Sequence, residues 1–323
     1  PTTQVTITNE LQALSRVPLL IGQDFEWGVG MRLDSTDRFP YASTIGAMKG
    51  NEHLIEEMGK EVARQCKRIG VHINYAPVVD VNNNPNNPVI NFRSFGSDKY
   101  QVTAKGLAYM KGMQSQGLLC TAKHFPGHGD TDADSHYALP VINHDKKRLH
   151  DIELYPFRQL IDQGISGIMT AHLNIPALEP QSGLASTFSK NIITKLLKDE
   201  LKFDGLIFTD AMEMEGAVKN FPKGEAMVQA LLAGNDILET FMDVPETVAA
   251  LKNAIESKKI SMALIEAKVK KILMAKSWVG LDQFVPILTE NLVEDLNTVK
   301  ADILNQQMTE KSITVLKNEA GLL

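Results

Sequence analysis

Short runs of apolar, often β-branched residues alternate along the chain with longer stretches in which apolar positions recur at helical spacing. An apolar run, a polar loop and an amphipathic helix together form the pattern of a parallel βα unit. The apolar runs predict strands over residues 17–21, 71–79, 118–122, 167–171, 205–208 and 236–241. The longer stretches predict helices over residues 52–69, 99–116, 145–163, 189–200, 223–233, 245–256 and 260–277.

Polar or ionisable residues follow the carboxyl ends of the predicted strands. In chain order they are Asp24, Asp80, Lys123 with His124, His172 and Asp210. In a (β/α)8 barrel the carboxyl ends of all strands meet at one face, whereas an open doubly wound sheet gathers ligands only near its switch point. The pattern therefore favours an α/β fold of the TIM-type (β/α)8 barrel class. Because fewer than eight strands can be recognised, we expect the barrel to be incomplete at its N-terminus.

Composition and charge narrow the class of partner. The 323 residues include 33 Lys and Arg against 39 Asp and Glu, a net charge of −6, and 43% are hydrophobic, as in globular proteins. No block rich in Lys or Arg offers phosphates a positive surface, so we expect no nucleic-acid partner. No apolar run is long enough to cross a bilayer, so we expect a chain that is not membrane-embedded. A small or neutral molecule is the partner that fits this composition best.

The densest group of reactive side chains lies in residues 123–136, which read KHFPGHGDTDADSH. Pro126, Gly127 and Gly129 interrupt regular structure there, so the segment is predicted to be a long loop after a strand. Three interpretations remain open.

In the first interpretation the loop is solvated, and its polar residues make local turns. In the second it is a metal site, with ligands drawn from His124, His128, Asp130 and Asp132. In the third it transfers protons, with Asp134 accepting a hydrogen bond from His136 and orienting its ring.

Asp210 stands where an apolar strand is predicted to end, in the segment FTDAMEM of residues 208–214. A carboxylate in such a place is costly unless it is paired or used in chemistry. The alternative is that Asp210 caps the following helix.

Residues 123–136 resemble the KHFPGHG…DSH loop of the glycoside hydrolase family 3 β-N-acetylglucosaminidases, which act on peptidoglycan fragments in bacteria. Other parts of the family pattern follow in the family's order at residues 22–28 (GQDFEWG), 74–81 (NYAPVVDV), 92–96 (FRSFG), 169–172 (MTAH) and 208–214. The resemblance covers roughly residues 17–278. It implies a catalytic barrel over residues 1–278 and a linker over 279–323 that leads toward a C-terminal α/β domain of a longer protein.

The resemblance implies roles for individual residues. Asp210 is the expected nucleophile, and His136 with Asp134 is the expected general acid and base. The residues expected to bind the N-acetylglucosamine unit are Asp24, Arg93, Lys123, His124 and His172. No metal and no cofactor are expected. This sequence departs from the family at Ala211, where many members have a second Asp.

The expected activity is that of a retaining β-N-acetylglucosaminidase, which hydrolyses terminal β-linked N-acetylglucosamine from peptidoglycan fragments (muropeptides) through a covalent glycosyl-Asp intermediate. Alternatives with the same fold are a β-glucosaminide phosphorylase and a hydrolase of chito-oligosaccharides or β-glucosides. A metal-dependent hydrolase and a catalytically silent sugar-binding barrel are alternatives of other classes. The resemblance to two-domain members favours the cell envelope, periplasmic or secreted, over the cytoplasm.

Overall fold

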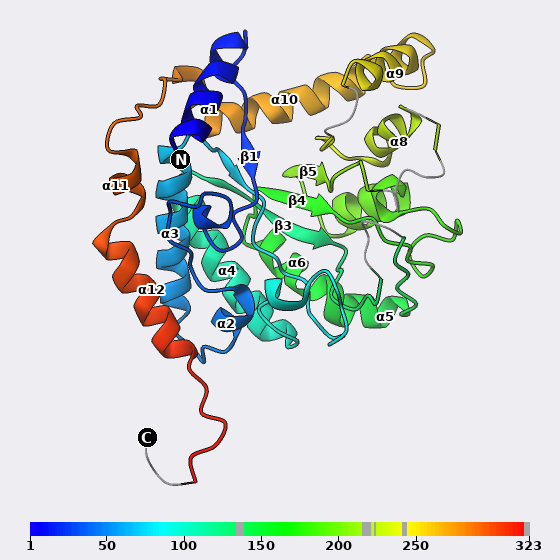
Figure 1. The fold of residues 1–323 in the computed structure, drawn as a ribbon. Helices are drawn as coiled ribbons and strands as arrows, with labels where there is room; N and C mark the ends of the chain where they lie inside the picture. The colour runs from blue at the N-terminus through cyan, green and yellow to red at the C-terminus, as the bar shows by residue number, and fades with distance from the viewer. Residues whose placement is uncertain (134–138, 215–220, 223, 241–243, 320–323) are drawn as a thin grey trace.

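The computed structural model describes residues 1–133, 139–214, 221–222, 224–240 and 244–319. A parallel sheet of five strands, in the order β1-β2-β3-β4-β5, lies at its centre (Figure 1). The strands are β1 (Gly22–Gln23), β2 (Ile73–Asn74), β3 (Leu119–Phe125), β4 (Gly167–Thr170) and β5 (Leu206–Thr209). Because sheet order follows chain order and every pair is parallel, the carboxyl ends of the strands lie along one edge.

The three longer strands lie in the interior of the fold. Every residue of β3, β4 and β5 is buried, which fits a parallel sheet with both faces covered. The described helices are α1 (Thr2–Leu14), α2 (Ala42–Gly46), α3 (Glu52–Arg68), α4 (Lys99–Ser115), α5 (Lys146–Arg148), α6 (Leu154–Asp162), α8 (Glu225–Ala233), α9 (Val244–Glu256), α10 (Met262–Trp278), α11 (Leu292–Leu296) and α12 (Val299–Ser312). Among the described helices, none is both long and apolar enough to cross a membrane.

Shorter and wider turns complete the described elements. Four are 3-10 turns: η1 (Val29–Met31), η2 (Asn91–Arg93), η4 (Ser186–Phe188) and η6 (Leu281–Gln283). Two are π-helical: η3 (Leu149–Glu153) and η5 (Asn191–Glu200). The helix predicted over residues 145–163 is therefore divided into α5, η3 and α6, and the one predicted over 189–200 is a π-helix.

The prediction of a (β/α)8 barrel, incomplete at its N-terminus, is wrong, although the parallel α/β class is right. The segment predicted as a strand over residues 236–241 contributes, where it is described, a single bridge between Phe208 and Ile237. The described chain beyond this bridge forms helices and loops, so the sheet has no later strand there to pair with β1. A barrel requires that pairing of its last strand with its first.

The segment predicted as a linker packs against α3 over much of its described length. Helices α11 and α12 run beside α3 (Figure 1), and Leu296 and Met308 are fully buried. Gln65 of α3 donates a hydrogen bond to the carbonyl of Leu296 at 2.9 Å. Arg68 pairs with Asp295 at 2.8 Å. These contacts make residues up to Ser312 part of the same folded body.

Helices α3 and α4 approach each other closely at two glycines. A Cβ placed on Gly112 would lie 2.1 Å from the backbone oxygen of Glu56, and one on Gly59 would lie 2.6 Å from the backbone oxygen of Tyr109. Backbone atoms cannot yield as a flexible side chain can. Glycine is therefore required at this crossing for steric reasons.

We expect Gly112→Ala to lower the free energy of unfolding by about 1–3 kcal/mol, because overpacking outweighs the roughly 1 kcal/mol that alanine gains in helix propensity. Urea unfolding at pH 7 measures the change. Lys111→Ala, at an exposed position of the same helix, is the control and should change stability by less than about 0.5 kcal/mol. A Gly112→Ala protein as stable as the parent would contradict the steric argument.

Candidate active site

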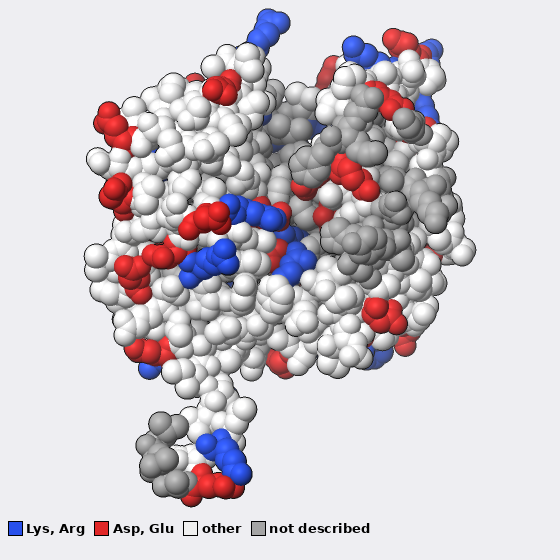
Figure 2. All heavy atoms as spheres, viewed as in Figure 1, with Lys and Arg blue, Asp and Glu red and all other residues white. Residues whose placement is uncertain are grey.

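A pocket of about 390 Å³ opens at the carboxyl ends of the strands. It brings together Asp24, which follows β1, Arg93 of η2, Lys123 and His124 of β3, and Asp210, which follows β5. All five were predicted as site residues. Asp24, Lys123, His124 and Asp210 meet because parallel strands end at the same edge, and Arg93 reaches them from η2. Figure 2 shows basic and acidic side chains beside each other around a hollow near the middle of the molecular face.

Lys123 forms the centre of a buried network of charges. Its side chain is 2% exposed, and its Nζ lies 2.6 Å from Asp24 Oδ1 and 2.9 Å from Glu26 Oε1. Arg93 binds Glu26 through two nitrogens, with Nη2 at 2.7 Å from Oε1 and Nε at 3.0 Å from Oε2. Arg32 pairs with the other oxygen of Asp24 at 3.0 Å. Each buried charge therefore faces an opposite charge, as it must to offset its desolvation.

Glu26 is a site residue that the sequence prediction missed. Burial acts to raise the pKa of its carboxyl, but Lys123 and Arg93 outweigh that effect and hold the pKa far below its usual range. The side chain is 3% exposed and fixes two cations at once. Its position two residues after Asp24, in the turn that follows β1, was the available clue.

Asp80, which does not line the pocket, fixes the ring of His124 through a hydrogen bond. The Asp80 carboxylate is fully buried and accepts hydrogen bonds from His124 Nδ1 at 2.7 Å and from the backbone N–H of His128 at 2.7 Å. Because a carboxylate only accepts, the proton of His124 lies on Nδ1, and Nε2 accepts from Arg93 Nη2 at 3.2 Å. Burial acts to raise the pKa of Asp80, but His124 and His128 lower it below its usual value.

Asp210 is held by its backbone and by one carboxylate oxygen. Its N–H donates to the carbonyl of Thr170 at 3.0 Å, and its Oδ1 accepts from the N–H of Ala211 at 2.9 Å. Within the described residues its Oδ2 accepts no hydrogen bond. Burial acts to raise the pKa of Asp210, but interactions with His124 and His172 and the hydrogen bond from Ala211 lower it below its usual value.

His172 lies behind Asp210 and outside the pocket lining. Its Nε2 donates to the carbonyl of Ala211 at 3.1 Å, and its Nδ1 contacts the hydroxyl of Thr187 at 2.8 Å. Burial lowers the pKa of His172, although Asp210 opposes the shift. With both ring nitrogens engaged, the imidazole orients the residue next to Asp210.

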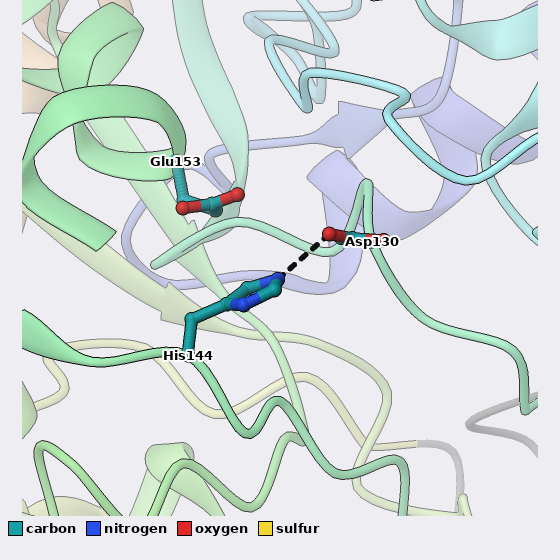
Figure 3. Close-up of side chains that lie close together, drawn as sticks. All are labelled: Asp130, His144 and Glu153. Atoms are coloured by element: carbon teal, nitrogen blue, oxygen red, sulfur yellow. Dashed lines mark hydrogen bonds and ion pairs between the residues drawn. The ribbon is translucent and has the colours of Figure 1, made fainter. Parts of the chain in front are cut away.

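Asp134 and His136, the predicted acid and base pair, lie outside the described residues. The loop is described up to residue 133, and there Asp130 Oδ2 accepts a hydrogen bond from His144 Nε2 at 2.7 Å (Figure 3). Ligand atoms of Asp130, His144 and Glu153 lie within 4.8 Å of one another, close enough to hold a metal ion.

Arg148 changes that interpretation. Its Nη2 lies 2.9 Å from Glu153 Oε1 and 3.4 Å from Asp130 Oδ2, so the guanidinium already balances both carboxylates. A divalent cation would have to displace it. In the described part of the chain, His124 and His128 belong to no such cluster. The cluster in Figure 3 therefore fastens the loop at Asp130 to η3.

An aromatic group borders the pocket. Trp27 lines it, and its ring centroid lies 4.8 Å from that of Tyr41 and 6.1 Å from that of Phe92. Tyr41 and Phe92 are 42% and 45% exposed. Aromatic faces of this kind can pack against the apolar C–H face of a saturated ring. Glu239, a second residue that the sequence prediction missed, also lines the pocket.

Comparison with known proteins found a matching protein family and similar sequences. The family model described as the glycosyl hydrolase family 3 N terminal domain matches residues 2–275. The beta-hexosaminidase A of Pseudoalteromonas piscicida is 34% identical over 301 residues, which cover 84% of this chain and 50% of that protein.

Solved structures agree with this placement. A glycoside hydrolase family 3 beta-N-acetylglucosaminidase from Paenibacillus sp. str. FPU-7 superposes with a TM-score of 0.88 at 37% identity, covering 99% of this chain and 62% of that one. The beta-glucoside phosphorylase BglX superposes with a TM-score of 0.91 at 28% identity, covering 99% and 60%. The chain thus spans between half and about three fifths of these relatives' lengths.

We expect Asp80→Asn to lower the free energy of unfolding by about 2–4 kcal/mol. The carboxylate now accepts hydrogen bonds from N–H groups, and the amide nitrogen of asparagine would place another donor against one of them. Urea unfolding at pH 7 measures the loss. The ¹⁵N NMR signals of the His124 ring should also show that the imidazole no longer prefers the tautomer with the proton on Nδ1. Asp282→Asn, at an exposed position, serves as the control. Unchanged stability and an unchanged tautomer in Asp80→Asn would rule out this role.

Proposed function

The chain belongs to the family of glycosyl hydrolase family 3 N-terminal domains, and on this basis we propose that it is the glycan-cleaving part of a retaining β-N-acetylglucosaminidase. The observation that carries the proposal is the position of Asp210. It lies in the pocket with one carboxylate oxygen held by Ala211, and opposite it is a preformed set of charged side chains.

Asp210 has the properties that a glycosidase nucleophile needs. Its lowered pKa keeps it ionised near neutral pH, and its backbone is fixed at the end of a buried strand. In the first step Oδ2 attacks the anomeric carbon, the bond from that carbon to the glycosidic oxygen breaks, and a glycosyl ester forms. Water then attacks the same carbon, and Asp210 leaves with the electron pair of the ester bond.

The charged network supplies the sugar-binding groups. Asp24, Arg93, Lys123 and His124 line the pocket and already hold one another in place. Little side-chain freedom is therefore lost when hydroxyl groups bind to them, which favours affinity. The assignment of His172 differs, because its ring is buried behind Asp210. We assign it the positioning of Ala211 and Asp210 instead of sugar binding.

The leaving oxygen needs a proton, for which we propose His136 oriented by Asp134. Histidine has an ordinary pKa of about 6.5 and can act as acid and base near neutral pH without burial. His136 gives its proton to the departing oxygen in the first step and takes one from water in the second.

The sugar and its source are the finer part of the proposal. The names of the two relatives described above as a hexosaminidase and an N-acetylglucosaminidase support an N-acetylhexosamine substrate. Peptidoglycan fragments are the proposed source because the loop at residues 123–136 resembles that of enzymes acting on them.

A phosphorylase is the second candidate, favoured by the close superposition on the beta-glucoside phosphorylase BglX. In that reaction phosphate replaces water in the second step, and the product is a sugar phosphate. Analysis of the products formed with and without inorganic phosphate distinguishes the two.

We expect the chain to release the aryl group from an aryl β-N-acetylglucosaminide faster than from the matching β-glucoside. Asp210→Ala should reduce the rate by about a thousandfold or more, because no covalent intermediate can form. Absorbance of the released aryl group measures both. Asp282→Asn is the control for a lost carboxylate, and a chelator should leave the rate unchanged. Comparable activity in Asp210→Ala, or loss with the chelator, would exclude this mechanism.

His136→Ala should separate substrates by leaving group. We expect kcat/KM to fall by about 10²–10⁴-fold for a disaccharide, whose leaving oxygen needs the proton. An activated nitrophenyl glycoside should form the glycosyl-enzyme nearly as fast as before, as a burst of nitrophenol in rapid mixing. Equal losses on both substrates would refute His136 as the acid.

A further inference from the structure

Glu239 is fixed beside Asp210 by its own backbone. Its N–H donates to the Thr209 hydroxyl at 2.9 Å, and its carbonyl accepts from the N–H of Met212 at 2.9 Å. These two partners flank Asp210 in the sequence. The segment that carries Glu239 is therefore tied to both sides of the proposed nucleophile, and its side chain lines the same pocket.

The carboxyl of Glu239 differs from the other acids of the pocket. Asp24 and Glu26 are each paired with cations, and Asp210 accepts a hydrogen bond from the backbone. Within the described residues the Glu239 carboxyl has neither a hydrogen-bond nor an ion-pair partner. Glu239 lines the pocket and is only partly buried, so its carboxyl is open to a bound ligand and free to form a hydrogen bond with it.

The surrounding charges oppose its ionisation. Burial, followed by the negative charges of Asp210 and Asp24, raises the pKa of Glu239 to about 7, although Lys123 acts against the shift. The groups that act on it from the elements around it are Asp24, Tyr75, Lys123, Asp210 and Glu213. Of these, Lys123 is the only cation, and it is already paired with Asp24 and Glu26.

We propose that Glu239 is a sugar-binding residue that meets the glycan as a neutral carboxylic acid and donates a hydrogen bond to it. The identity of the ligand rests on the function proposed above. A neutral acid can donate, whereas a carboxylate can only accept. Ionisation of Glu239 therefore removes the donor and places a further negative charge next to Asp210, so sugar binding and proton binding at Glu239 favour each other.

The test is calorimetric titration of N-acetylglucosamine into the 323-residue chain, and it needs no catalysis. At pH 7.5, binding should take up a fraction of a proton, measured as a binding enthalpy that depends on the ionisation enthalpy of the buffer. Between pH 5.5 and pH 8.5 the affinity should fall about three- to tenfold, as expected for one lost hydrogen bond.

Glu239→Gln keeps the shape and a donor but cannot ionise. We expect it to bind without the proton uptake and to lose the fall in affinity that the parent chain shows between the two pH values. Glu256→Gln, at an exposed position of α9, is the matched control and should behave as the parent. Binding by the parent chain without proton uptake, or the same pH dependence in Glu239→Gln, would overturn the proposal, as would no detectable binding.

Two checks distinguish failure of this inference from misfolding of the variant and from failure of the proposed function. Circular dichroism verifies that Glu239→Gln folds, and if it does not, proton uptake by the parent chain decides alone. A parent chain that binds with proton uptake but cleaves no aryl glycoside would refute the proposed hydrolase and leave the role of Glu239 standing. A parent chain that cleaves the aryl glycoside but binds N-acetylglucosamine independently of pH would support the proposed hydrolase and refute the role of Glu239.

Discussion

The pairing of buried Lys123 with Asp24 and Glu26 is the interaction on which the arrangement of the site depends. A lysine in the middle sheet strand, 2% exposed, would be strongly destabilising without opposite charges in contact. Those charges come from the loop after β1, and Glu26 in turn recruits Arg93 from η2. One cation at the end of β3 thereby fixes segments that lie far apart in the chain.

A second layer of contacts holds the first in place. Asp80, fully buried, determines which nitrogen of His124 carries the proton, and His172 determines the position of the residue after Asp210. Asp80 and His172 can affect ligand binding without touching the ligand. Such supporting contacts restrict the side chains that do touch it, which is how a pocket becomes preorganised.

Two carboxyl groups of the same pocket are shifted in opposite directions. Burial raises the pKa of both Asp210 and Glu239, but the surroundings of Asp210 reverse the shift and those of Glu239 reinforce it. The charge that Asp210 retains is itself one reason why Glu239 resists ionisation. Environments that separate two acids in this way allow one to serve as an anion and the other as a neutral donor.

The sequence by itself determined the parallel βα order and the gathering of Asp24, Lys123, His124 and Asp210. These follow from local patterns, because apolar runs mark buried strands and the residues that end parallel strands share one edge. The helices were likewise predicted wherever amphipathic spacing was strong. Arg93, which lies away from strand ends, came from motif resemblance alone. The pair of Asp134 and His136 was one of three interpretations that the loop left open, and the resemblance selected it.

The tertiary structure decided what depends on contacts between distant segments. Closure of the sheet is a pairing of first and last strands, which no local pattern records, and the barrel prediction failed there. Glu26, Asp80 and Glu239 acquire their roles from partners, or from the lack of one, on other elements. His172 follows a strand as predicted, yet it lies outside the pocket lining and its ring contacts Thr187 and Ala211 instead. A side chain's surroundings are fixed only when the chain packs, and they decide its charge and its function.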